Sequence, residues 1–339
     1  MKKIMLTIIL TCLTVKINYT QVKNKLELYL KKPPESFMEN SSDISINHQE
    51  ISNLISQNDR YISQNRKASI EKVKVTKIPN QNFEHYLETH DENGKNVDIG
   101  SKNSLGNGII NNNLVFTSRI SSVTNLIISN KNIENINGIE DFVQLKHLNI
   151  SNNSITDIDL SKNLMLESLI ANENKIQNIV LETNHNLREV NLNENNLKQI
   201  YISNLLNLIK FSANDNRLIE INLNKNINLT DLHLQRNQLK EIDLKNNINL
   251  INLSLGENQL KKIDITYNTN LKTLFIYKNN LQHFNCTNNP YLEFLYASQN
   301  EISSINLSNN VSLKFLSVYK NKLDNLDLSF NKNLERIWI

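Results

Sequence analysis

Apolar residues recur every 21 positions from Leu145 to the end of the chain. Ten copies begin at Leu145, Leu166, Leu187, Leu208, Leu229, Leu250, Leu271, Leu292, Leu313 and Leu334, and the last copy is incomplete. Counted from that leucine, the apolar positions are offsets 0, 3, 5, 10, 13 and 15. A fixed period in the twenties predicts a solenoid in which each coil buries its apolar face against its neighbours.

The spacing of these apolar positions predicts short strands. Offsets 3 and 5 alternate as in a strand with one buried face, and offsets 10, 13 and 15 repeat the spacing of 0, 3 and 5. No part of the repeat is long enough for a helix of ordinary length. We therefore predict a mainly β repeat solenoid of about ten coils, with two short strands per coil and a small helical N-terminal cap. Strands about 4.8 Å apart make it a rod on the order of 45 Å long.

Two columns of asparagine follow the same period. Offset 8 is asparagine in all full copies, namely Asn153, Asn174, Asn195, Asn216, Asn237, Asn258, Asn279, Asn300 and Asn321. Offset 18 holds Asn163, Asn184, Asn226, Asn247, Asn268, Asn289, Asn310 and Asn331, and Leu205 interrupts it once. A buried amide both donates and accepts, so stacked asparagines are expected to satisfy backbone groups where the chain turns.

The string L-x-x-L-x-L-x-x-N-x-L resembles the leucine-rich repeat. The nested 21-residue form ends as in Ile158-Asp159-Leu160-Ser161-Lys162-Asn163. This form resembles the bacterial leucine-rich repeats of secreted proteins in Bacteroidetes-type bacteria, and it is distantly similar to internalins. The resemblance covers about 123–339 and implies a secreted or cell-surface recognition protein.

The segments before the repeats predict export and a polar spacer. Residues 1–20 resemble a signal peptide, with Lys2 and Lys3 before the apolar run Ile4–Leu10, which is too short to span a membrane. Lipid anchoring at Cys12 is the rival interpretation, although Thr11 fits lipoprotein processing poorly. Residues 21–76 are polar and weakly patterned, so we expect a spacer that is partly disordered or helical.

Residues 77–122 resemble the N-terminal cap of such repeats, and the repeat domain follows over 123–339. We expect Asn82 to cap a short helix that buries Phe83, Tyr86 and Leu87. The first repeat contains Ile136-Asn137-Gly138-Ile139-Glu140-Asp141-Phe142. This stretch resembles the internalin form, in which a short helical turn replaces the second strand.

No pattern in the sequence indicates catalysis or a resident cofactor. The net charge is +3 without a basic block, which argues against nucleic acid. There is no H-E-x-x-H, Gly-rich phosphate loop or G-x-S-x-G. Asp91, Asn93 and Gly94 resemble the start of a calcium loop, but Lys95 replaces an oxygen ligand and no bidentate Glu follows. We therefore expect an ordinary turn-rich loop, no metal site and a protein that is not an enzyme.

The outward-facing residues of the first strand change from polar to aromatic along the chain. Offsets 2, 4 and 6 are mostly polar in the early coils but become aromatic from Leu271 onward. The seven aromatic residues are Phe275, Tyr277, Phe294, Tyr296, Phe315, Tyr319 and Trp338. Exposed aromatics supply contact area at low entropic cost, so we predict a surface that binds a protein or glycan. The alternative is that they shield the end of the stack in a passive spacer.

Three further expectations concern single positions. The polar residues at offset 14, such as Asp159 and Asp264, form a stripe that either is simply solvated or collects cations. Cys286 occupies a core position and is expected to be a small core hydrophobe. The last strand at Leu334–Ile339 either caps the stack or lets two molecules associate.

Overall fold

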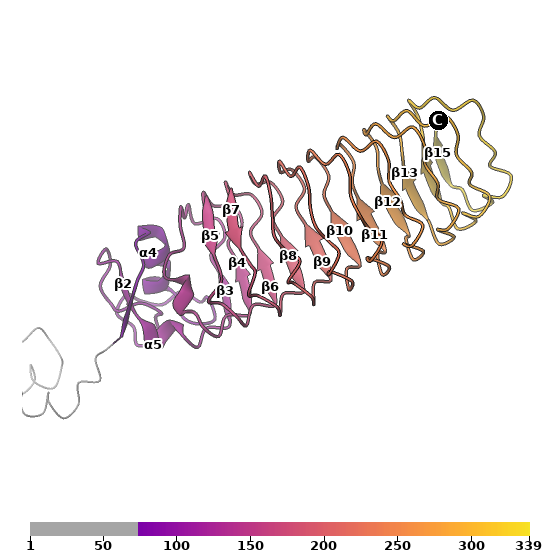
Figure 1. Ribbon diagram of the computed structural model, residues 1–339. Helices are drawn as coiled ribbons and strands as arrows, with labels where there is room; N and C mark the ends of the chain where they lie inside the picture. Colours follow the sequence, from indigo (N-terminus) through magenta and orange to yellow (C-terminus); the bar gives the residue numbers. More distant parts are fainter. Residues whose placement is uncertain (1–73) are drawn as a thin grey trace, which may run out of the picture. The chain divides into compact units, whose positions relative to one another are not determined.

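The computed structural model describes residues 74–339. The expected signal peptide over 1–20, the lipidation candidate Cys12 and nearly all of the 21–76 spacer lie outside these residues. The described part is a mainly β solenoid that begins at a small mixed cap and continues as a stack of similar coils (Figure 1).

One parallel sheet of eleven strands runs the length of the solenoid (Figure 1). Each strand has three residues and pairs in register with the equivalent strand of the next coil, as Leu232 does with Leu253. The strands are β3 (Asn125–Ile127), β4 (His147–Asn149), β6 (Ser168–Ile170), β8 (Glu189–Asn191), β9 (Lys210–Ser212), β10 (Asp231–His233), β11 (Asn252–Ser254), β12 (Thr273–Phe275), β13 (Phe294–Tyr296), β14 (Phe315–Ser317) and β15 (Arg336–Trp338).

The second strand that we expected in each coil is present in only two of the described coils. These two strands are β5 (Asp157–Asp159) and β7 (Asn178–Val180), which pair in parallel. The Asn178 side chain donates to the Asp157 carboxylate at 2.7 Å and supports this pair. Further along, the equivalent positions hold like charges at Glu220 and Glu241, which disfavour pairing there, but the later coils with Lys262 and His283 also lack this strand.

The offset-8 asparagines join neighbouring coils as expected. Asn237 accepts from the backbone N–H of Leu218 in the preceding coil at 2.9 Å. Its amide donates to the carbonyls of Ala213, Leu234 and Gln235 at 2.9, 3.2 and 3.2 Å. Each such asparagine therefore replaces the backbone partners that are lost where the chain turns.

The offset-18 asparagines are also buried, but in most of them only the amide N–H groups form hydrogen bonds, while the side-chain oxygen has no partner. Asn226 donates to the carbonyls of Ile202 and Leu205, both at 2.9 Å. Its Oδ1 has no hydrogen-bond partner within the described residues, and the same holds along most of the column. At Asn310 the Cys286 thiol fills this role, with its Sγ 3.3 Å from Oδ1. Cys286 itself is fully buried in the core, as expected.

The N-terminal cap closes the first coil with two helices and a two-stranded antiparallel sheet. β1 (Val75–Lys77) pairs antiparallel with β2 (Leu114–Phe116), and the helices are α4 (Gln81–Thr89) and α5 (Thr117–Ile120). Phe83, Tyr86 and Leu87 of α4 are buried as predicted. The expected cap residue was wrong: Asn80, in an extended conformation, accepts from the Phe83 N–H at 3.0 Å.

Two buried carboxylates and one arginine organise the loop that follows α4. Glu88 accepts from the N–H groups of Asn107 and Gly108 at 2.6 and 2.7 Å, and Glu84 accepts from those of Asn112 and Asn113 at 2.9 and 2.8 Å. The Arg119 Nη1 donates to the carbonyl oxygens of Ser101, Ser104 and Gly106 and to the Ser104 hydroxyl, over 2.8–3.2 Å. The Arg119 guanidinium thus holds residues 101–106 of this loop together by hydrogen bonds.

The stretch considered as a calcium loop is a turn. The Asp91 Oδ1 accepts from the backbone N–H groups of Asn93 and Lys95 at 3.0 and 2.9 Å, while Gly94 adopts a φ of 74°. The first repeat has a 3₁₀ turn, η2 (Ile139–Asp141), in the second half of its coil. This agrees with the expected short helical turn in place of a second strand. Gly138 precedes η2 with a φ of 101°.

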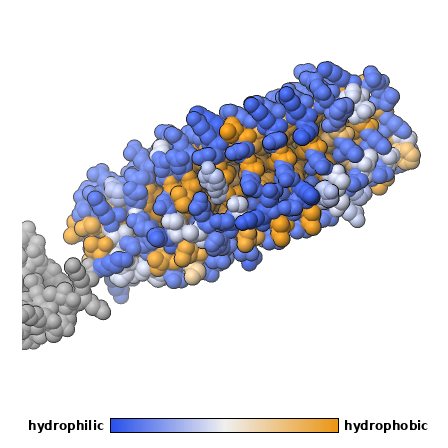
Figure 2. Space-filling model, viewed as in Figure 1, coloured by the Kyte–Doolittle hydropathy of each residue, from blue (hydrophilic) through white to orange (hydrophobic). Residues whose placement is uncertain are grey.

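The solenoid surface combines hydrophilic rows with apolar bands. Figure 2 shows a band of hydrophobic residues along the stack, bordered by hydrophilic residues on both sides. On the side opposite the long sheet, several offset-13 residues are partly buried against the core, among them Ile179, Ile221, Ile242 and Ile305. Across residues 74–339, no helix is both long and apolar enough to cross a membrane.

Candidate functional site: an aromatic row on the long sheet

Four of the seven predicted site residues form one stacked row across the C-terminal coils. The ring centroids of Phe275 and Tyr296 are 4.4 Å apart, and those of Tyr296 and Phe315 are also 4.4 Å apart. Phe315 then meets Trp338 edge to face, with centroids 5.2 Å apart and planes at 79°. We call these four residues the aromatic row; they come from β12 to β15, at the end of the solenoid away from the cap (Figure 1).

Phe315 enters the aromatic row from a different register position. Phe275, Tyr296 and Trp338 all occupy offset 4, where β14 has Ser317, whereas Phe315 occupies offset 2. Ser317 is small and only 1% exposed, which leaves room for the Phe315 ring between Tyr296 and Trp338. Phe315 is itself only 8% exposed, so it supports its neighbours more than it offers surface to a partner.

The other three predicted residues border the row without stacking in it. Phe294 is 38% exposed and lies in register between Thr273 and Phe315. The Tyr277 ring packs over Gly256 of the preceding coil, so closely that a Cβ at Gly256 would lie 2.5 Å from it. Tyr319 lies two coils beyond Tyr277, and its hydroxyl accepts from the Gln299 amide at 3.0 Å.

Ladders of charge run along both borders of the sheet face. On one border Arg236 bonds Asp215 and approaches Glu257 at 3.8 Å, and Glu257 pairs with Lys278 at 2.9 Å. On the other border Lys314 pairs with Glu293 at 2.5 Å. These side chains are partly exposed to solvent, so each pair contributes little stability. They nevertheless keep the borders polar next to the aromatic row.

Burial changes the acid–base properties of three groups in the repeats. Desolvation raises the pKa of Tyr277 and lowers that of His233, which lies on the same sheet face further toward the N-terminus. Burial raises the pKa of the Cys286 thiol to about 12, so it stays protonated. Within residues 74–339, no three His, Cys, Asp or Glu side chains come together as a metal site.

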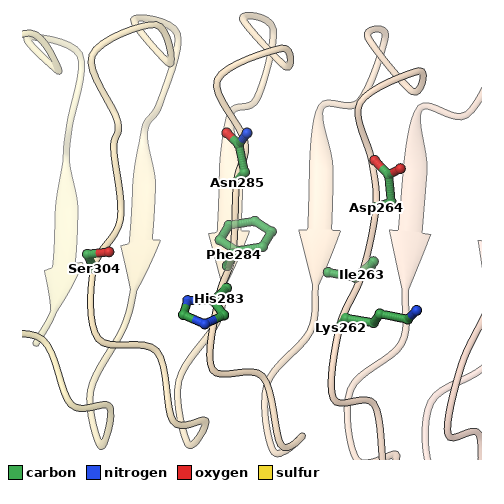
Figure 3. A pocket seen from close by; sticks show the side chains of 7 residues that line it. All are labelled: Lys262, Ile263, Asp264, His283, Phe284, Asn285 and Ser304. Carbon is green, nitrogen blue, oxygen red and sulfur yellow. The ribbon is translucent and has the colours of Figure 1, made fainter.

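A shallow hollow lies on the opposite side of the coils. Figure 3 shows Ile263 and Phe284 from adjacent coils at its centre, with Lys262 and His283 toward one end and Asp264 and Asn285 toward the other. The Asp264 Oδ1 accepts from the N–H of Thr266 at 3.0 Å, and the Asn285 Oδ1 accepts from that of Thr287, also at 3.0 Å. These oxygens serve the turn of their own coil rather than converge on a shared ligand.

The same turn explains the polar stripe at offset 14. Asp159, Asn222, Asp243, Asn306 and Asp327 likewise accept from the backbone N–H two residues further on, over 2.8–3.1 Å. Asx turns of this kind are a standard local use of Asp and Asn. The stripe therefore has a structural role that the sequence interpretation had not assigned, in every full coil except those with Val180 and Tyr201 at this offset.

Sequence reasoning also missed two sets of residues: the small residues that make room for the aromatic rings, and the cations that lie beside the aromatic row. Gly256 and Ser317 are small residues at outward-facing positions of the sheet. Lys272 and Arg336 flank the row at offsets 1 and 2. Reading every outward column for size and charge, rather than for aromatics alone, would have found all four.

Comparison with solved structures supports the same fold. The functional domain of InlJ from Listeria monocytogenes, which includes a cysteine ladder, matches with a TM-score of 0.69 at 23% identity, over 78% of this chain and 57% of that chain. A leucine-rich-repeat protein from Leptospira interrogans matches with a TM-score of 0.60 at 19% identity, over 65% of this chain and 62% of that one. This chain therefore spans less than two thirds of either.

Comparisons with protein-family models and with curated protein sequences found no match. The parallel in-register sheet, the asparagine columns and the two structural matches together show that the described residues adopt the leucine-rich-repeat fold.

Proposed function

We propose that this protein is a non-catalytic recognition protein that binds a protein or glycan partner through the aromatic row. The observation that carries the proposal is the aromatic row itself, which ends at the exposed Trp338 and is bordered by Phe294. Aromatic side chains are enriched at binding hot spots because they bury large areas with few rotatable bonds.

The stacking gives the surface a second advantage. Each aromatic pair contributes roughly 0.5–1.5 kcal/mol beyond its buried area. The rings are thus held in place before a partner arrives, which reduces the ordering cost of binding. The early coils lack such a surface, since their equivalent residues include Asn149, Asn191 and Ser212.

The proposal includes export to the cell surface or medium. Its support is the sequence of residues 1–20, with two lysines before an apolar run. The mass and N-terminal sequence of the protein recovered outside the producing cells test this part. A mature chain that starts near Gln21 is expected, whereas a full-length protein retained in the cytoplasm would contradict export.

A passive spacer is the second candidate function. The observation in its favour is that Phe315 is nearly buried and that the stacked rings tie four coils together. In that case the aromatics would act as a structural spine of the C-terminal coils. Their removal would then lower stability without affecting any partner.

A pull-down with the full chain distinguishes the two candidates. The baits are the unchanged protein, a Phe294→Ser/Trp338→Ser variant, and a Tyr201→Ser/Tyr267→Ser control. The control residues are 61% and 51% exposed and lie outside the long sheet. A partner retained by the control and lost by the first variant supports recognition through the row. A partner retained by all three baits contradicts the aromatic row as the binding site but leaves recognition standing, and no partner at all favours the spacer.

A further inference from the structure

The stacking determines which part of each aromatic ring a partner meets. Phe275, Tyr296 and Phe315 lie face to face along the direction in which the coils stack, at interplanar angles of 30° and 20°. Tyr296 is therefore covered on both faces, and Phe275 and Phe315 are covered on the face toward it, so these three rings present mainly their edges to solvent. The edge is the positive pole of the aromatic quadrupole, so the row favours oxygen atoms and anions over flat groups that need an open ring face.

The sheet face also divides into an acidic and a basic part. At offsets 1, 2, 4, 6 and 7, the coils from Leu145 to Leu250 carry seven carboxylates and four cations, which gives a net −3 with His neutral. The coils from Leu271 onward carry five cations and two carboxylates at the same offsets, a net +3. The cations of the second group are Lys272, Lys278, Lys314, Lys320 and Arg336. The aromatic row thus lies in the basic part.

Three of these five cations lack a salt-bridge partner. Lys278 and Lys314 form ion pairs with Glu257 and Glu293. No carboxylate of residues 74–339 forms a salt bridge with Lys272, Lys320 or Arg336.

These three unpaired cations lie beside the aromatic row or beside the neighbouring Tyr319. The Lys320 Nζ lies 6.0 Å from the centre of the Tyr319 ring, and Arg336 is in register with Phe315. Lys272 directly precedes β12, the strand that carries Phe275. An anionic group on the row would therefore meet positive charge from several sides.

We propose that the aromatic row takes an acidic segment of a protein, whose carboxylates meet Lys272, Lys320 and Arg336 while its apolar side chains pack against Phe294 and Trp338. This inference rests on the proposed recognition function and names the chemistry of the partner. The acidic coils toward the N-terminus repel the same segment, which confines it to the C-terminal coils. Charges arranged in this way govern specificity and association rate more than affinity.

Trp338 provides a direct readout because it is the only tryptophan of the chain and belongs to the row. The full-length protein is titrated with a short synthetic peptide in which Glu alternates with Leu. The same peptide with Lys in place of Glu and a neutral chitin oligosaccharide serve as comparison probes. We expect the acidic peptide alone to shift the Trp338 emission to saturation, and we expect added salt to weaken its binding because exposed charges are screened.

Charge reversal gives the second arm of the test. Lys272→Glu/Lys320→Glu is expected to weaken binding of the acidic peptide about tenfold. Glu occupies both positions in other coils, as Glu293 at the position of Lys272 and Glu257 at the position of Lys320. Because Lys272→Glu would lie beside Glu293, circular dichroism first checks that the variant is folded. The control Lys240→Glu/Lys261→Glu makes the same change in net charge at exposed positions outside the long sheet and is expected to leave binding unchanged.

Each contrary result has a definite meaning. Preference for the basic peptide or the sugar, equal binding by both charge variants, or no binding of any probe overturns the acidic partner. If a non-acidic probe or a captured partner still requires Phe294 and Trp338, the recognition function stands while the acidic-partner inference fails. If nothing that binds requires these residues, both fail.

Discussion

Replacing one asparagine in each of the two columns should reveal their different roles. In Asn237→Ala, the buried N–H of Leu218 loses its acceptor at 2.9 Å, whereas the carbonyl of Ala213 loses one donor at 2.9 Å but still accepts from the Asn216 amide at 3.3 Å. Asn226→Ala removes two hydrogen bonds as well, to the carbonyls of Ile202 and Leu205. Those carbonyls, however, still accept from the backbone N–H groups of Leu205 and Leu208, at 2.9 and 3.2 Å.

The magnitudes follow from the number of groups left without a partner. A buried polar group without a partner costs about 1–3 kcal/mol, so Asn237→Ala, which creates one at the Leu218 N–H, should destabilise the fold by about 1–3 kcal/mol. Asn226→Ala creates none and also removes an Oδ1 that has no partner, so its cost should be about 1 kcal/mol or less. The natural chain supports this difference because Leu205 replaces asparagine in the second column and is fully buried.

Urea unfolding followed by far-ultraviolet circular dichroism measures both costs. The two variants delete the same atoms from buried sites in neighbouring coils, so each serves as the control for the other. We expect a clearly lower midpoint for Asn237→Ala at an unchanged slope. Equal midpoints, or a lower one for Asn226→Ala, would refute the assignment of the first column as the hydrogen-bonding link between coils.

Three further changes test other parts of the structure. Gly138→Ala should lower the melting temperature by the equivalent of about 2–3 kcal/mol, because its φ is 101° and the new Cβ would lie 2.7 Å from the Lys77 carbonyl oxygen; an unchanged melting temperature would contradict this. Arg119→Met should make residues 98–113 more sensitive to limited proteolysis, since four oxygens lose one donor; an unchanged cleavage pattern would argue against its role. Hydrogen bonds from Thr266 hold the pKa of Asp264 below its ordinary value of 3.8. Its contribution to stability is therefore complete above that value and lost as the pH falls through the lower folded-state pKa. Asp264→Asn should make acid unfolding less steep, and identical profiles for variant and parent would count against this turn as an acid-sensitive element.

The repeat period was sufficient to predict the stack, its core and its main asparagine column. Each coil has the same contacts as its neighbours, so one spacing rule places Leu232, Leu253 and Leu274 in register. The second strands were harder to predict, because strand pairing there depends on which side chains face each other between coils. Asp157 and Asn178 form a hydrogen bond and pair, whereas neither the like charges Glu220 and Glu241 nor the opposite charges Glu241 and Lys262 form a strand pair among the described residues.

The candidate site was predicted in outline but not in its packing. Period and alternation placed seven aromatics on one face, and the structure stacks four of them. The offset rule assigns Phe315 to another column, and only the small volume of Ser317 shows why its ring enters the row. A shift of the helix start by two residues, from Asn82 to Asn80 as cap, reflects the limited precision of sequence signals at helix ends.

The affinity of a partner captured by the full-length protein tests the central claim most directly. Its dissociation constant is measured for the parent, for Phe294→Ser/Trp338→Ser and for Tyr201→Ser/Tyr267→Ser. Because a single hot-spot aromatic contributes at least about 2 kcal/mol, loss of even one should weaken binding at least about thirtyfold in the first variant, while the control should match the parent. Equal affinities for all three proteins would contradict recognition through the aromatic row.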